Sequence, residues 1–170
     1  ADAVLALEPD HRAARRLALA LAGEREAWTE YVVHGEALLR LPAEAGSQAD
    51  PDRLRLAVAR VYADLLAQPV QSLVHLRALD ARGALPVDAV ALYLQAARSA
   101  GDPDAHLAAL RARVRLTGTA AARLVLAEHL LLTDHPAEAL AEVSGIDPAD
   151  LDHDERQRLA LVRDEAADAE

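Results

Sequence analysis

Three prolines recur along the chain at nearly equal intervals and in the same local context. Pro69 and Pro103 are 34 residues apart, and Pro103 and Pro136 are 33 residues apart. A leucine follows each proline after four residues, and another apolar residue follows three residues later. Proline suits the first turn of a helix, where the backbone N–H that it lacks would have no partner. The prolines therefore predict the starts of repeated helices, and the interval predicts a stack of similar helical units.

A second helical stretch precedes each of these prolines, so the expected unit is a helical hairpin. The preceding helices are expected at 52–67, 87–100 and 119–132, within repeat hairpins at 52–83, 87–118 and 119–148. Glycine adopts positive φ values without strain, and it is common where a helix ends. The glycines expected to end helices are Gly83, Gly101, Gly118 and Gly145.

The apolar composition favours helices over sheets. Apolar residues make up 52% of the chain, with no Phe or Met and one Trp, so Ala, Leu and Val must supply the core. Ala has the highest helix propensity and lets neighbouring helices approach closely. The valines do not alternate with polar residues at the two-residue period of a strand. We therefore expect an all-α fold in a single domain, with enough apolar surface to bury a core.

The spacing of small and large residues resembles the tetratricopeptide repeat family, whose unit is a helix–turn–helix of about 34 residues. In the copy that starts at Ala120, Leu126, Ala127 and Leu130 match the family's large, small and large positions on the first helix. The small and packing positions of the second helix are occupied by Ala139, Val143 and Ile146. The resemblance implies antiparallel helical hairpins stacked as a right-handed α-solenoid.

The other two copies match this pattern unequally. The copy that starts near Asp52 fills the same columns with Val58, Ala59, Tyr62 and Ser72. The copy that starts near Val87 departs from it, because Leu94 and His106 occupy columns where the family prefers small residues. We expect looser or shifted packing in that copy.

The N-terminal part of the chain is more divergent. Residues 1–9 resemble the end of a preceding repeat, so we expect the chain to be a segment of a longer array. Residues 10–42 are expected to form a divergent hairpin. Asp10 would cap a first helix that runs to Leu21, and a long second helix would occupy 24–41.

Two further segments lie outside the repeats. Residues 43–51 are polar and contain Gly and Ser, which predicts a mobile loop inserted between hairpins. Residues 152–170 are expected to form a capping helix and tail, since Asp152 and Glu155 have the spacing of a capping box. The apolar face of this helix is thin and consists of Leu159 and Val162. Such a helix suits the solvent-exposed end of a stack.

The resemblance implies a function in binding a partner protein or peptide through a concave groove, which the first helices of successive repeats line. The alternative for each exposed residue on these helices is an ordinary solvated side chain. The residues mapped to the groove by register are Arg60, Asp64, Asp88, Gln95, Arg98, Glu128 and Leu131.

The sequence carries no recognisable catalytic or metal-binding pattern, so we expect neither enzymatic activity nor a cofactor. It lacks a nucleophile elbow, a phosphate-binding glycine loop and a zinc-protease helix motif. His129, Asp134 and His135 form the densest group of possible ligands, but the two histidines are six residues apart, which is too far for one helix face. We interpret His106 as a packed or partner-bonded side chain, and His34 and His75 as surface residues.

Charge and hydropathy exclude other classes of partner. The formal net charge is −10, which repels a phosphate backbone, so we expect no nucleic-acid binding. No apolar run is long enough to span a membrane. The chain has no cysteine, so redox chemistry does not indicate a compartment, and cytoplasm and periplasm both stay open.

Three alternatives remain open at this stage. The chain can be an adaptor that binds a protein, or a ligand-sensing regulatory domain of a larger signalling or transcriptional protein. It can also form a homo-oligomer through its ends, where Val4, Leu5 and Leu7 are apolar. Trp28 and Tyr31 share a helix face, and we favour core packing over an exposed anchor for this pair.

Overall fold

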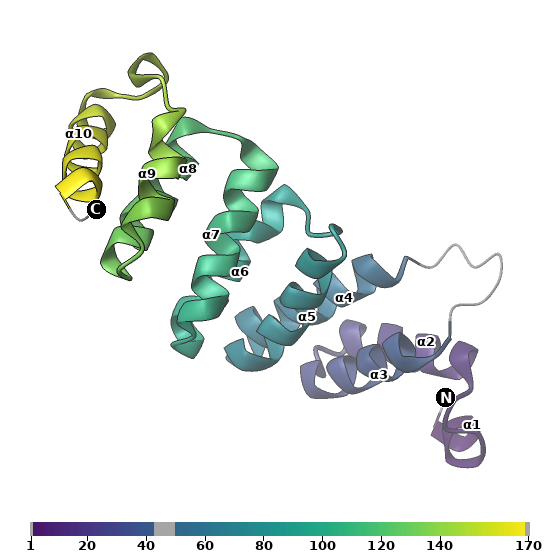
Figure 1. Ribbon diagram of the computed structural model, residues 1–170. Helices are drawn as coiled ribbons and strands as arrows, with labels where there is room; N and C mark the ends of the chain where they lie inside the picture. The colour runs from purple at the N-terminus through teal and green to yellow at the C-terminus, as the bar shows by residue number, and fades with distance from the viewer. Residues whose placement is uncertain (1, 43–49, 169–170) are drawn as a thin grey trace. The chain divides into compact units, whose positions relative to one another are not determined.

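The computed structural model describes residues 2–42 and 50–168, and all regular secondary structure in these ranges is helical. The expected all-α fold is therefore confirmed (Figure 1). The α-helices are α1 (Asp2–Leu7), α2 (Arg12–Glu24), α3 (Trp28–Arg40), α4 (Pro51–Arg60), α5 (Pro69–Ala81), α6 (Val90–Ala100), α7 (Pro103–Thr117), α8 (Ala120–Leu132), α9 (Pro136–Ser144) and α10 (His153–Asp168). Three short turns of other types are η1 (Val61–Leu65, π-helical), η2 (Val87–Ala89, 3-10) and η3 (Pro148–Asp150, 3-10).

The chain divides into two compact units. The first consists of Ala1–Leu85 and Ala91–Gly101, and the second consists of Pro86–Val90 and Asp102–Glu170. In the first unit α2 packs against α3, α3 against α4, and α4 against α5. In the second unit α8 packs against α9, while α10 lies against both and α7 lies against α8. The hairpin expected at 87–118 is shared between the units, and the single domain over 1–170 stays a prediction.

The prolines begin helices, as predicted. Pro69, Pro103 and Pro136 each occupy the first turn of α5, α7 and α9. Asp102 strengthens the start of α7, because its side chain accepts a hydrogen bond from the Ala105 N–H at 2.8 Å. Local chemistry therefore determines where these three helices start.

A glycine stands at the end of each helix where one was expected, but only three of the four glycines have a positive φ. Gly83, Gly101 and Gly118 have φ values of 66°, 62° and 63°, which places all three in the left-handed region. Gly118 is the C-cap of α7, and its N–H donates to the Val114 carbonyl at 2.8 Å. Gly145 is the C-cap of α9, as expected, but the expectation of a positive φ is wrong there, since its φ is −94°, which any residue can adopt.

The N-terminal helix boundaries differ from those predicted. His11, and not Asp10, is the N-cap of α2, since its Nδ1 accepts from the Ala14 N–H at 3.2 Å. The helix then runs to Glu24, three residues beyond the predicted end. The next helix was expected to start at Glu24 but starts at Trp28. Glu26 has a φ of 56°, which interrupts the helical backbone between α2 and α3. The inserted loop was predicted at 43–51, of which 43–49 lies outside the described residues.

The helix expected at 52–67 changes type before it ends. It is α-helical from Pro51 to Arg60 and continues as the π-helical turn η1. At the end of η1 the Leu66 N–H donates to the Val61 carbonyl at 3.0 Å, and just beyond it the Gln68 N–H donates to the Tyr62 carbonyl at 2.8 Å. The wider turn shifts the side chains after Arg60 relative to an uninterrupted helix.

One core cluster of the first unit lies between α3, α4 and η1. Its buried members are Val32, Val58, Val61 and Tyr62, and the half-buried side chains packed against them include Trp28 and Tyr31. The rings of Trp28 and Tyr31 meet edge to face with centroids 6.1 Å apart. Core packing is therefore confirmed for this pair, with both side chains half-buried.

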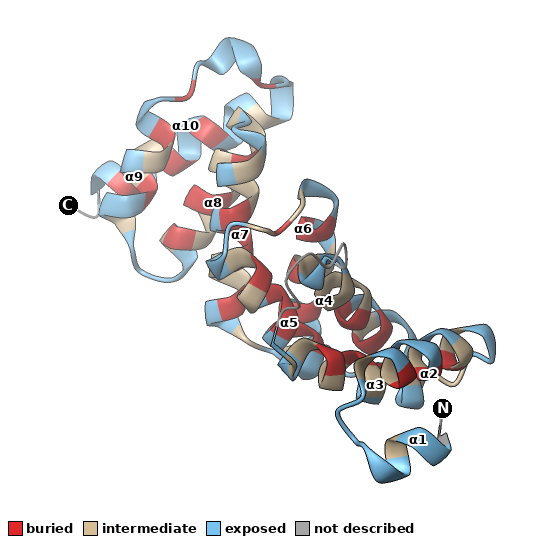
Figure 2. Ribbon diagram, turned by 90° about the vertical axis from the view of Figure 1, so that its right-hand side faces the viewer, coloured by how far each residue is buried: buried red, intermediate tan, exposed pale blue. Residues whose placement is uncertain are grey.

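The two copies with the better match bury the columns named above. Leu126, Ala127 and Leu130 on α8 are all at most 2% exposed, and Val58 and Ala59 on α4 are fully buried. Figure 2 shows the buried residues on the sides of the helices that face one another, with the exposed residues outside. In the copy near Val87 the columns shift by one position, as expected: Tyr93 is buried beside a half-buried Leu94, and Ala105 is buried beside a half-buried His106.

The start of α10 carries the predicted capping box. The Glu155 N–H donates to Asp152 Oδ1 at 2.8 Å, and the Asp152 N–H donates to Glu155 Oε2 at 3.1 Å. Leu159 and Val162 are buried on its inner face, together with Ala166. Most of its other residues are exposed, which agrees with the expected capping helix.

Candidate functional site

A groove between α8 and α10 in the second unit is the first candidate site. It has a volume of about 410 Å³. Its lining residues are Glu128, Leu131, Leu132, Arg158, Leu161, Val162 and Glu165. Two of its leucines are unusually exposed, since Leu132 shows 85% of its surface and Leu161 shows 61%. The groove therefore presents apolar surface that no described residue covers.

An ion pair between the two helices forms part of the groove wall. Arg158 Nε donates to Glu128 Oε1 at 2.6 Å, and a second guanidinium nitrogen donates to Glu128 Oε2. The hydrogen bonds that Arg158 donates to the Glu128 carboxylate raise the pKa of Arg158 above its ordinary value. Both side chains are partly exposed, so the pair contributes at most about 1 kcal/mol to stability, and its main effect is to hold α8 and α10 in register.

The charge of the groove is negative once this pair is counted as neutral. Glu165 on α10 is exposed and lines the groove, and no described residue forms an ion pair with it. Apolar surface beside an unpaired carboxylate is suited to a ligand that has both apolar and basic groups.

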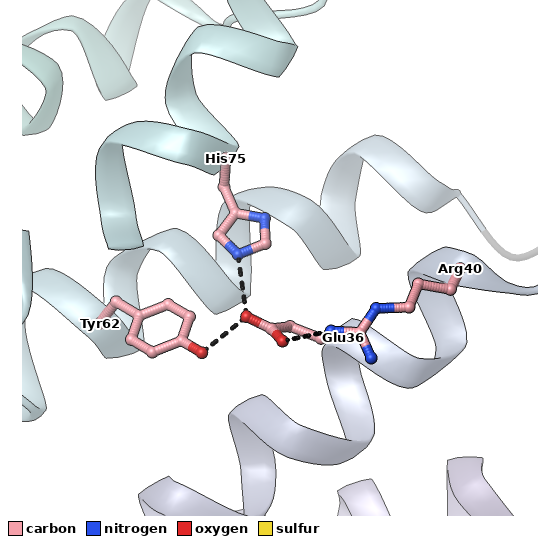
Figure 3. Close-up of polar contacts among 4 residues, drawn as sticks. All are labelled: Glu36, Arg40, Tyr62 and His75. Carbon is pink, nitrogen blue, oxygen red and sulfur yellow. Dashed lines mark hydrogen bonds and ion pairs between the residues drawn. The ribbon is translucent and has the colours of Figure 1, made fainter. Parts of the chain in front are cut away.

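A second candidate site, in the first unit, centres on Glu36 of α3 (Figure 3). The Tyr62 hydroxyl donates to Glu36 Oε1 at 2.7 Å, and a guanidinium nitrogen of Arg40 donates to Glu36 Oε2 at 2.9 Å. His75 Nε2 lies 3.7 Å from Glu36 Oε1, and the His75 ring stacks on Tyr62 with centroids 5.8 Å apart. One carboxylate therefore connects side chains from α3, η1 and α5.

Burial perturbs the protonation of two of these groups. It raises the pKa of Tyr62 to about 12, and the hydrogen bond to Glu36 acts in the same direction. Burial also lowers the pKa of His75, which outweighs the opposite effect of the Glu36 carboxylate. His75 is therefore a neutral ring at pH 7.

A pocket of about 280 Å³ opens beside this cluster. Its lining residues are Glu36, Leu39, Arg40, Arg55, Gln71, Val74 and His75. Two nitrogen atoms near it, Arg55 Nε and His75 Nδ1, are buried and accept or donate no hydrogen bond. The prediction of a surface position for His75 is wrong: the side chain is only 6% exposed, because it lies on the face of α5 that also buries Ser72, Leu76 and Leu79.

The residues predicted to bind a partner fall in both units. Glu128 and Leu131 line the groove between α8 and α10, and Asp88 is exposed on η2 of the same unit. The four in the first unit are the exposed residues Arg60, Asp64, Gln95 and Arg98. Gln95 lines a small pocket between α6 and η1. A role for these residues in partner binding stays a prediction.

Sequence reasoning missed the half of the groove that α10 supplies. The repeat interval of 33 residues leads from Glu128 to Leu161 on α10, one helical turn after Arg158, so the repeat register could have indicated this half of the groove. Treating α10 only as a solvated cap hid this relation.

The histidine group near the end of α8 has a packing role. The rings of His106 and His129 meet edge to face with centroids 5.0 Å apart. Across residues 2–42 and 50–168, no group of three or more His, Asp or Glu side chains lies close enough to hold a metal ion. Over the same ranges, no helix has the length and apolar character that crossing a membrane requires.

No protein-family model matches the chain, and no curated protein matches it.

Proposed function

We propose that the chain is a protein-interaction module that holds a segment of a partner protein in the groove between α8 and α10. The observation that carries this proposal is the exposure of two leucines that line the groove, Leu132 at 85% and Leu161 at 61%. The buried Val162 lines the same groove. Large apolar side chains gathered at one groove are typical of binding surfaces, whereas scattered ones are ordinary.

The occupant that fits best is an amphipathic peptide segment with a basic residue. Two apolar side chains of the segment would cover Leu132 and Leu161, and a Lys or Arg would face Glu165. The net charge of −10 favours the approach of a basic segment over an acidic one.

The repeat pattern supports the same function. In a tetratricopeptide-like stack, the first helices of successive hairpins lie side by side and line a concave face. We propose that α8 and α10 are the first helices of two successive repeats, and that the hairpins stack as a right-handed superhelix. The binding face would then continue along the first helices of the other repeats, through Arg60, Asp64, Asp88, Gln95 and Arg98. The repeat interval of 33 residues relates Glu128 on α8 to Leu161 on α10, and both line the groove, which supports this assignment.

Selection from a library of random peptides displayed on phage tests the proposal without a known partner. We expect the native chain to enrich peptides that carry two large apolar residues and at least one Lys or Arg. The Leu161→Asp variant, which places a charge in the groove, should fail to enrich them, while the matched variant Leu17→Asp on the exposed face of α2 should enrich the same set.

Two results would count against this function. One is the enrichment of no common pattern by the native chain. The other is enrichment of the same peptides by the native chain and by Leu161→Asp, because binding would then lie away from the groove.

A further inference from the structure

The pocket formed by α3, α4 and α5 combines features that the proposed protein-binding function does not use. It lies entirely within the first unit, whereas the groove between α8 and α10 lies within the second. Its lining includes two guanidinium groups, one carboxylate and a buried imidazole, together with the apolar side chains of Leu39 and Val74.

The pocket has one positive charge left over. Arg40 and Glu36 form an ion pair at 2.9 Å, so their charges cancel. Arg55 is half-buried, its Nε is buried without a hydrogen bond, and no described residue forms an ion pair with it. A buried guanidinium nitrogen without an acceptor is costly, because the folded state has removed water from it and supplied no replacement.

His75 supplies a second unsatisfied atom at the same place. The side chain is 6% exposed, Nε2 points to Glu36, and Nδ1 is buried with no hydrogen bond. Burial lowers the pKa of His75, the positive charge of Arg55 acts in the same direction, and both side chains line the pocket. An anion bound in the pocket would accept from Arg55, and its negative charge would favour the protonated form of His75 against the effects of burial and of Arg55.

We propose that this pocket binds a small organic carboxylate, whose carboxylate group accepts hydrogen bonds from Arg55 and His75 and whose apolar part rests on Leu39 and Val74. The Arg40 and Glu36 pair closes one side, and the amide of Gln71 is available to a further polar group. The volume of about 280 Å³ lies just below the range of about 300–1,000 Å³ for small-molecule pockets. The ligand is therefore a small acid.

Binding is coupled to proton uptake by His75. With the carboxylate in place, both ring nitrogens have acceptors: Nε2 faces Glu36 and Nδ1 faces the ligand, so the ring takes one proton from solvent. The charged groups around the ring are Glu36 and Arg40 on α3 and Arg55 on α4, with the Tyr62 hydroxyl on η1. A site of this kind would make the first unit a ligand sensor, the alternative that the sequence left open.

Nuclear magnetic resonance titration tests the site with simple probes. The probe is 3-methylbutanoate, and the neutral isostere 3-methylbutanamide and inorganic phosphate serve as comparison ligands. The signal followed is the proton bound to a ring carbon of His75 in the histidine-labelled chain of 170 residues, assigned from its loss in His75→Gln. We expect saturable binding of the acid with a Kd on the order of 1 mM, a shift of the His75 signal toward the protonated form, and no saturation with the amide.

Variants separate binding from folding. Arg55→Gln should raise the Kd for the acid by at least about tenfold. The control is Arg53→Gln, which replaces an exposed arginine on the same helix and should leave the Kd unchanged. Arg55→Gln should also melt no lower than the native chain, because the substitution removes an unsatisfied buried nitrogen.

Three outcomes would overturn the proposal. The first is the absence of saturable binding by the acid. The second is equal binding of the acid and of phosphate, which would indicate a general anion site with no role for Leu39 and Val74. The third is an unchanged Kd in Arg55→Gln.

Discussion

The close approach of α3 and α4 gives the sharpest prediction about stability, and it concerns Gly35. This residue is buried in the middle of α3, one position before Glu36. A Cβ added at Gly35 would lie 2.6 Å from Val58 Cγ2, whereas an ordinary contact is at least 3.4 Å. Val58 is fully buried, and a β-branched side chain in a helix has one strongly preferred rotamer, so it cannot rotate away cheaply.

The magnitude follows from two opposing effects of Gly35→Ala. Alanine in a helix interior is favoured over glycine by about 1 kcal/mol. Overpacking a core costs about 1–3 kcal/mol, and a separation 0.8 Å short of contact (3.4 minus 2.6) belongs to that class. We therefore expect a net destabilisation of about 1 kcal/mol. The control is Gly23→Ala on α2, where the added Cβ would lie at an ordinary contact distance of 3.6 Å from the Tyr31 ring. This substitution should stabilise the chain by about 0.5–1 kcal/mol.

Denaturant unfolding followed by circular dichroism measures both changes. A double-mutant cycle then assigns the clash: Val58→Ala alone should cost about 2 kcal/mol, and in the Gly35→Ala background it should cost at least about 1 kcal/mol less, because the new methyl group fills part of the space. The reasoning would be refuted if Gly35→Ala stabilised the chain as much as Gly23→Ala, or if the two substitutions were additive.

Three further predictions concern individual contacts. Tyr62→Phe removes a 2.7 Å hydrogen bond to the Glu36 carboxylate and should cost about 1 kcal/mol in urea unfolding; no loss would mean that water replaces the bond. Because burial lowers the pKa of His75 below 6.5, the unfolded chain takes up the proton more readily, so stability should fall as the pH drops below about 6.5. That fall should be smaller in His75→Gln, and an equal fall in both chains would contradict the assignment. Asp152→Ala breaks the capping box with Glu155 and should cost about 1 kcal/mol in thermal unfolding, while Asp152→Asn should retain most of the stability.

Features that depend on neighbouring residues could be predicted from the sequence. The starts of α5, α7 and α9 follow from a proline in the first turn, and the capping box of α10 follows from two acidic residues three positions apart. Each involves backbone groups within one turn, so no knowledge of the packing partner is needed. The same reasoning failed at Asp10, because the adjacent His11 has a side-chain acceptor that reaches the same helix start.

Features that depend on how a helix is rotated against its neighbours could not be predicted. His75 is buried because α5 turns that face toward α3 and η1, and a polar residue type gave no sign of it. The π-helical turn that places Tyr62 beside Glu36 has no sequence signal of its own. The groove needed both α8 and α10, and only the α8 residues Glu128 and Leu131 were found by register.

The most direct test of the proposed function is the affinity of the native chain for one peptide selected as described above, measured by fluorescence anisotropy beside two variants. We predict that Leu161→Asp weakens binding by at least about tenfold, since an apolar contact is lost and a charge faces the groove, while Leu17→Asp binds as tightly as the native chain. Equal affinities for all three chains would contradict the assignment of the groove between α8 and α10 as the partner-binding site.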